Sequence, residues 1–279
     1  NRQTMNITQK YISWMNGSAY LVAGNFCTIF GRGLTLRAFE IPNVILESQA
    51  YRLRYLPSKD LEGGLASWIG DNIELKSLIG RPVKSDIPPG AKIGTPPKTV
   101  KRRKEWITGG EIGFRPFPSI KIGGTAVMRN PTDQESSWVW SVLNQINLNP
   151  FFKKSRLKKA YFNFYGEYAS RTKERGHALY LGGNVGGPKL GLEIEYKDYN
   201  NFLLQFNDPP SLVREHNSFL LNRSPHVLLP FNERGYQFEI TYTLPKLTTF
   251  TANISQGRND LNQTHEDNYG NSLIPIFTY

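Results

Sequence analysis

The sequence predicts an all-β fold, a transmembrane antiparallel up-and-down β-barrel with about 12–14 strands in its 279 residues. Three observations support this prediction. Apolar and polar residues alternate in segment after segment, the segments are long enough to cross a bilayer, and the connections between them alternate in length. We treat residues 1–279 as one outer-membrane barrel domain, which is part of a larger barrel if its first and last strands do not pair with each other.

The clearest alternation lies between residues 189 and 198. Leu190, Leu192 and Ile194 fall on one face of an extended strand, and Glu193 and Glu195 fall on the other. The same pattern recurs in four further segments, at 51–55, 106–115, 119–130 and 235–244. A soluble antiparallel sandwich with one wet face also alternates in this way. Alternation therefore predicts strands and leaves the environment of the apolar face open.

The lengths of the segments and connections favour a membrane barrel over a soluble sandwich. The segments run for about nine to eleven residues, as a tilted strand needs to cross a bilayer, whereas strands of soluble proteins average about five or six. Turns at Pro116–Pro118 and Gly186–Pro188 are short, whereas the loops at 82–105 and 200–234 are long. Outer-membrane barrels combine short periplasmic turns with long outer loops.

The composition excludes several other classes of protein. No run of eighteen apolar residues occurs in the sequence, which excludes a helical membrane span. The single cysteine, Cys27, excludes an intrachain disulfide. The formal net charge is +11.

Charged residues opposite the apolar stripes are expected to face the lumen of the barrel. The candidates are Arg52, Arg54, Glu74, Lys76, Glu111, Lys121, Arg129, Glu193, Glu195, Lys197 and Glu239. Both signs of charge occur among them. They would therefore fit a water-filled pore, in which they set selectivity, and equally a lumen closed by internal ion pairs.

A basic cluster at Lys98–Lys104, which includes Arg102 and Arg103, follows a proline-rich loop. Nucleic-acid binding would need stacking aromatic residues between these charges, and the cluster has none, so no nucleic-acid partner is expected. On an outer-membrane loop the cluster would contact anionic lipid, including lipopolysaccharide, or an acidic protein. A solvated loop without a partner is the alternative.

The sequence predicts no enzymatic activity. It contains no nucleophile elbow, paired-histidine metal motif or phosphate-binding loop, and Gly31–Gly33 is too short for a phosphate cradle and lies in a strand-like run. We therefore expect no catalytic residue, metal site or cofactor. A hydrolase site on the barrel rim around His216 is kept as the third hypothesis, to be tested by replacing that residue.

Two passages resemble a family of Bacteroidetes outer-membrane barrel proteins without a known activity. Gly24–Glu40 (GNFCTIFGRGLTLRAFE) resembles the family's strand pair GNFY…FGRGL.LR.YE. Pro209–His216 (PPSLVREH), followed by Leu221–Arg223, resembles the pattern NPP.LV.EH…LLNR of its long central loop. The resemblance implies an outer-membrane location, many antiparallel strands and members longer than this chain. It implies no reaction.

These observations lead to an expected function and two alternatives. The leading hypothesis is a structural or transport barrel in the bacterial outer membrane, acting alone or as a subunit with other outer-membrane or periplasmic proteins. The alternatives are a soluble β-rich module that binds glycans or proteins, and the rim hydrolase. The apolar loop that follows residue 208 is expected to plug the lumen or dock a partner, because its apolar residues need burial. Its candidate residues are Pro209, Pro210, Glu215, His216, Asn222 and Arg223.

Overall fold

A computed structural model describes most of the chain. The described residues are 10–38, 46–48, 51–53, 60–82, 104–131, 135–149, 160–173, 175–202, 204, 207, 233–245, 248–259, 265–266 and 272–273. Among them, no helix has the length and apolarity required to cross a bilayer.

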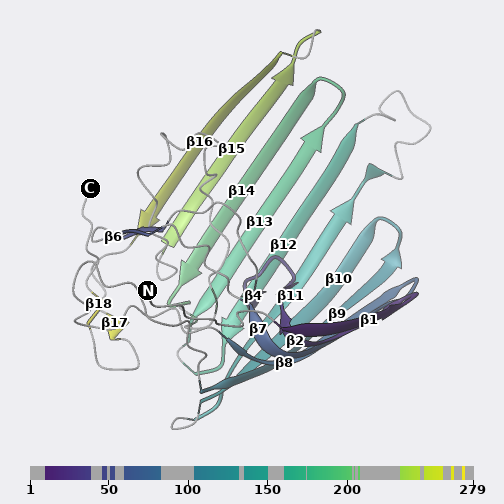
Figure 1. Ribbon diagram of the computed structural model, residues 1–279. Helices are drawn as coiled ribbons and strands as arrows, with labels where there is room; N and C mark the ends of the chain where they lie inside the picture. The colour runs from purple at the N-terminus through teal and green to yellow at the C-terminus, as the bar shows by residue number, and fades with distance from the viewer. Residues whose placement is uncertain are drawn as a thin grey trace, which may run out of the picture.

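Twelve strands form one curved antiparallel sheet in which each strand pairs with the next along the chain (Figure 1). The strands are β1 (Tyr11–Asn16), β2 (Ala19–Phe26), β7 (Leu61–Ile69), β8 (Ile73–Pro82), β9 (Trp106–Phe117), β10 (Ile120–Asn130), β11 (Ser137–Asn147), β12 (Tyr161–Arg171), β13 (His177–Gly186), β14 (Leu190–Asn200), β15 (Glu233–Thr243) and β16 (Thr249–Asn259). From β9 onward the strands have 10 to 12 residues. The expected fold class, an all-β up-and-down sheet of membrane-barrel length, is confirmed.

The two faces of the sheet have opposite polarity. Glu111 on β9 is 6% exposed, whereas its neighbour Ile112 is 56% exposed. The same inversion recurs on β15, where Gln237 is 3% exposed and Phe238 is 38% exposed. We call the face that carries Glu111 and Gln237 the inner face and the other the outer face. Because water favours the reverse arrangement, an apolar outer face indicates a hydrocarbon environment.

The connections keep one parity along the whole sheet. The connections 27–60, 83–105, 131–136, 172–176 and 201–232 join the strands at one end, which we call the loop side. The connections 17–18, 70–72, 118–119, 148–160, 187–189 and 244–248 join them at the other end, the turn side. The sequence predicted this alternation from Lys84 onward.

The connection between β2 and β7 departs from the expected layout. It contains the hairpin β3 (Thr28–Phe30) and β4 (Leu36–Ala38) and the hairpin β5 (Leu46–Ser48) and β6 (Tyr51–Leu53), and neither hairpin belongs to the twelve-stranded sheet. A third hairpin outside that sheet pairs β17 (His265–Glu266) with β18 (Ser272–Leu273). The prediction that 51–55 is a wall strand carrying Arg52 was therefore wrong, since β6 pairs with β5 alone. The alternating segment is too short to cross a membrane. Segment length therefore distinguishes the strands of this hairpin from the strands of the wall.

The apolar core lies between the β3–β4 hairpin and the inner face. Phe30, Leu34 and Leu36 of the hairpin are essentially inaccessible to water, and so are Val127 and Ala169 of the wall. Burial of each large side chain contributes about 1.5–3 kcal/mol relative to its exposure. This core stabilises the hairpin inside the curve of the sheet.

The described sheet ends at β1 and at β16, each of which pairs with one neighbour. A strand edge in hydrocarbon leaves backbone groups without partners, at several kcal/mol per group. In a membrane, both edges must therefore be covered by strands beyond the twelve or by each other. An even number of strands makes β1 and β16 antiparallel, which is compatible with either solution.

The polarity of the outer face predicts the effect of a charge placed there. Ile194→Arg, at the middle of β14, should destabilise the folded protein by about 2–4 kcal/mol, whereas Trp106→Arg at the loop-side rim should cost about 0–1 kcal/mol. Urea titrations of refolding into phospholipid vesicles measure both values. Equal costs at the two positions would contradict a membrane-embedded outer face.

Candidate functional site

The β3–β4 hairpin turns through Gly31-Arg32-Gly33. Gly31 has φ +55° and Gly33 has φ +99°, backbone conformations that favour glycine. Close packing also requires glycine at position 31, because a Cβ there would lie 2.7 Å from a carboxylate oxygen of Glu167. The Gly33 N–H closes the turn by donating to the Phe30 carbonyl at 2.8 Å. The prediction that 31–33 lies in a strand was wrong, since two glycines with positive φ end β3 and reverse the chain.

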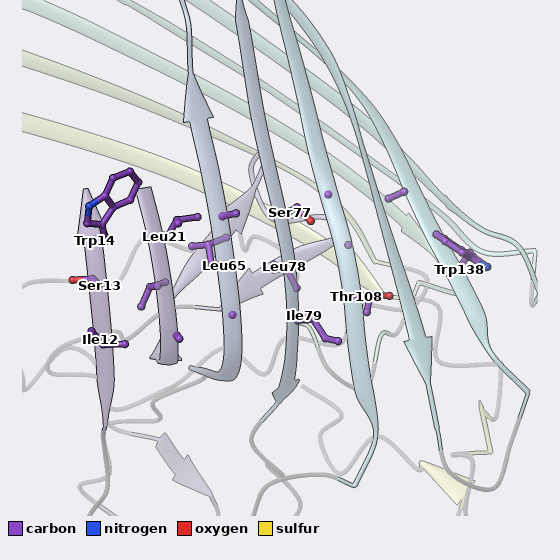
Figure 2. A pocket seen from close by; sticks show the side chains of 17 residues that line it. Ile12, Ser13, Trp14, Leu21, Leu65, Ser77, Leu78, Ile79, Thr108 and Trp138 are labelled. Atoms are coloured by element: carbon purple, nitrogen blue, oxygen red, sulfur yellow. The ribbon is translucent and has the colours of Figure 1, made fainter. Parts of the chain in front are cut away.

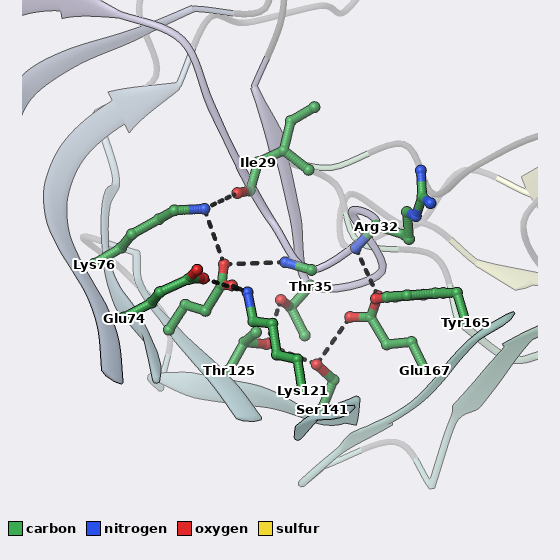
Figure 3. A network of polar contacts seen from close by, with 12 residues as sticks. Ile29, Arg32, Thr35, Glu74, Lys76, Lys121, Thr125, Ser141, Tyr165 and Glu167 are labelled. Atoms are coloured by element: carbon green, nitrogen blue, oxygen red, sulfur yellow. Dashed lines mark hydrogen bonds and ion pairs between the residues drawn. The ribbon is translucent and has the colours of Figure 1, made fainter. Parts of the chain in front are cut away.

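Two carboxylates of the wall bind the backbone of this turn (Figure 3). The Gly31 N–H donates to Glu111 Oε2 on β9 at 3.1 Å, and the Arg32 N–H donates to Glu167 Oε2 on β12 at 2.8 Å. Glu167 is 1% exposed. These two contacts join the turn to β9 and β12, which bound a span of four wall strands.

A chain of hydroxyl groups extends the attachment between the two carboxylates. Thr35 of the hairpin lies 2.6 Å from the hydroxyl of Thr125, which lies 2.8 Å from that of Ser141. Ser141 in turn donates to Glu167 Oε1 at 2.9 Å, and the Tyr165 hydroxyl donates to Oε2 at 2.6 Å. These polar groups are satisfied by one another, as buried polar groups require.

An ion-pair cluster fills the inner face of β8, β9 and β10. Lys76 Nζ contacts Glu111 at 3.2 Å and also donates to the Ile29 carbonyl of the hairpin at 3.1 Å. Lys121 lies 2.5 Å from Glu74 and 3.6 Å from Glu111. Arg115 pairs with Glu74 as well. On this side of the lumen, charges that sequence analysis assigned to the interior are joined into an internal network.

The connection after β14 also contacts the hairpin. Asn207 Nδ2 donates to the carbonyls of Gly33 and Leu34, both at 2.9 Å, and its Oδ1 accepts the Arg37 N–H at 2.6 Å. Asn207 is 2% exposed, and Phe202 in the same connection is 0% exposed. The described beginning of the long 200–234 loop therefore folds inward, whereas residues 209–223, the expected plug, lie outside the described residues.

The two arginine side chains of the hairpin lie close to tyrosines of β12 to β14. The Arg32 guanidinium lies over the Tyr165 ring at 5.0 Å from its centroid, a cation–π arrangement. Burial lowers the pKa of Arg37 in β4, while the nearby Tyr180 and Tyr199 act in the opposite direction. An arginine nevertheless remains charged in proteins, so the hairpin brings two cations into the lumen.

The structure places the predicted lumen residues as follows. The register puts nine of them on the inner face, namely Glu74, Lys76, Glu111, Lys121, Arg129, Glu193, Glu195, Lys197 and Glu239. Arg129 pairs with Glu105 at 2.6 Å, and Lys197 pairs with Glu233 at 2.6 Å. Arg54, Arg102, Arg103 and the loop residues Pro209, Pro210, Glu215, His216, Asn222 and Arg223 lie outside the described residues.

Glu167 and the hairpin itself are the features that sequence reasoning missed. Glu167 lies in Tyr161–Arg171, where apolar and polar residues alternate less regularly than in β14. The signal for the hairpin was present, because two glycines flank Arg32 between segments too short to cross a membrane. Within the described part of the chain, no group of three or more His, Cys, Asp and Glu side chains is placed to hold a metal ion.

Two solved structures from Pseudomonas aeruginosa resemble this one. OpdL shares 8% sequence identity with a TM-score of 0.48, over 82% of this chain and 58% of that chain. OpdQ shares 9% identity with a TM-score of 0.47, over 84% of this chain and 60% of that chain. This chain thus spans less than two thirds of the length of either structure.

No curated protein sequence is significantly similar to the chain. A family model, described as a family of unknown function (DUF6029), matches residues 1–272, which is nearly the whole sequence. The chain belongs to the DUF6029 family.

Proposed function

We propose that this protein is an outer-membrane barrel whose lumen is narrowed by its own β3–β4 hairpin, so that it acts as a constricted transport barrel rather than an open diffusion pore. The observation that carries the proposal is the attachment of the Gly31–Gly33 turn to two wall carboxylates, Glu111 and Glu167. A segment held in this way occupies the space through which a solute would pass.

The strength of the attachment supports a stable constriction. Each hydrogen bond contributes at least about 0.5–1.5 kcal/mol, and the buried apolar side chains of the hairpin add to it. Detaching the hairpin would leave Glu167, which is 1% exposed, without one of its donors. The hairpin is therefore a fixed part of the barrel in the resting state, and any passage runs beside it.

The alternative functions find less support. A soluble binding module needs its apolar face packed against another layer, yet Ile112, Ile194 and Ile254 on the outer face are 49–66% exposed. The rim-hydrolase hypothesis depends on His216, which lies outside the described residues. An outer-membrane location, with the loop side outward, is part of the proposal and is supported by the arrangement of loops and turns. A bacterial source among the Bacteroidetes is also part of the proposal.

The membrane location predicts how the protein behaves during purification. The folded protein should require detergent, should fractionate with outer membranes, and should migrate differently on a gel before and after heating, because a barrel resists unfolding by detergent alone. Cell fractionation and gel migration with and without heating measure these properties. A purified chain that stays monodisperse without detergent would rule out the proposal.

The constriction predicts an effect of Gly31→Val on ion conductance. The valine side chain would collide with Glu167 and would also be strained at a positive φ, which should displace the turn from the wall and raise the conductance. Single-channel recording in planar bilayers compares it with the wild-type protein, which should conduct weakly. A matched control is Gly187→Val, a turn-side position where a Cβ meets nothing within 4 Å.

A second pair of variants separates release of the hairpin from a general loss of wall charge. Glu167→Ala removes an acceptor of the hairpin, whereas Glu239→Ala removes another buried inner-face carboxylate, which accepts from Asn253 at 3.0 Å. Only the first should raise the conductance. An open, highly conducting wild-type channel, unchanged by Gly31→Val and Glu167→Ala, would contradict a constriction by the hairpin.

A further inference from the structure

A groove of about 960 Å³ crosses the outer face of β1, β2, β7, β8 and β9 and reaches β11 (Figure 2). Its floor consists of small outer-face residues on successive strands, including Ala66, Ser77 and Gly110. Trp14 on β1 flanks one end and Trp138 on β11 flanks the other. Ala66 is opposite Ser77 in the register, and Ser77 is opposite Gly110. These side chains are small and lie between large ones, which leaves a depression in the outer face.

A polar cluster lies directly above the groove at the loop-side rim of the same face. Arg81 follows the groove residue Ile79 by two positions on β8, so the two side chains share the outer face. Glu62 on β7 contacts Arg81 at 3.0 Å and Lys10 at 3.3 Å. The Arg81 guanidinium also lies 5.3 Å from the centre of the Trp106 ring. Two cations thus share one carboxylate at the rim.

Both cations of this cluster are reachable from outside. The side chain of Arg81 is 39% exposed and that of Lys10 is 71% exposed. A guanidinium and an ammonium close to an aromatic side chain at the membrane interface suit an anionic oxygen. The groove and the cluster together offer a cationic head site above an apolar cleft that points toward the middle of the bilayer.

We propose that this outer-face groove binds a lipid of the loop-side leaflet, namely lipopolysaccharide, with a phosphate of its lipid A part at Arg81 and Lys10 and an acyl chain over Ala66 and Ser77. The assignment rests on the proposed outer-membrane location, which puts the loop side outward. Charge complementarity favours a phosphate-bearing amphiphile over a second copy of the chain. A purely apolar protein surface would offer these two cations no acceptor besides Glu62.

Titration of the full-length protein, folded in detergent micelles, with purified diphosphorylated lipid A tests the proposal, with bound lipid counted by native mass spectrometry. Ala66→Leu or Ser77→Leu fills the groove and should weaken binding about tenfold, as expected from excluding about two methylene groups. Arg81→Gln removes one cation from the head site and should weaken binding about fivefold.

Two matched controls accompany these variants. Ala252→Leu adds the same bulk on the outer face of β16, away from the groove. Arg234→Gln removes an arginine at the loop-side end of β15, where it pairs with Asp198 at 2.8 Å. Both should bind lipid A as tightly as the wild-type protein. Gel migration before and after heating, measured for every variant, reports separately whether the barrel has folded and whether the proposed location in a membrane holds.

Three results would overturn the inference while leaving the proposed function standing. The first is binding of lipid A that Ala66→Leu, Ser77→Leu and Arg81→Gln leave unchanged in correctly folded protein. The second is equally tight binding of phosphatidylglycerol with the same sensitivity to these variants, which would assign the groove to a phospholipid. The third is loss of a lipid-free dimer in Ala66→Leu, which would assign it to a second copy.

Discussion

Backbone hydrogen bonding between neighbouring strands is the constraint on which the rest of this structure depends. Hydrocarbon offers no partner to an N–H or C=O group, so each strand that crosses the membrane must pair on both sides. The ten wall strands between β1 and β16 meet this demand in chain order through antiparallel registers. The alternation of faces follows, because successive side chains of a paired strand point to opposite sides of the sheet.

The polarity of the inner face then determines what the lumen contains. Carboxylates such as Glu111 and Glu167 are buried behind a low-dielectric wall, and buried charges need partners. The β3–β4 hairpin supplies them through the backbone N–H groups of Gly31 and Arg32. The wall and the hairpin therefore stabilise each other. On the outer face, the groove lies where small residues replace large ones.

The fold was more predictable from the sequence than the candidate site. Regular alternation in β14 and β15 predicted both the strands and the inner placement of Glu193, Glu195 and Glu239, because a period of two residues is a local property. The partner of a lumen charge is not local. Glu167 meets Arg32 across 135 positions of sequence, and no spacing in the chain indicates that pairing.

The sequence by itself determined the strands, their lengths, the alternation of their faces and the order of short and long connections, because each depends on neighbours in the chain. Only the tertiary structure decided that Gly31–Gly33 turns inside the lumen, that Asn207 holds it there, and that Ala66, Ser77 and Gly110 align into one groove. These features arise where distant strands come into register, and the physical reason is that sheet curvature and the need to satisfy buried polar groups act across the whole wall rather than along one segment.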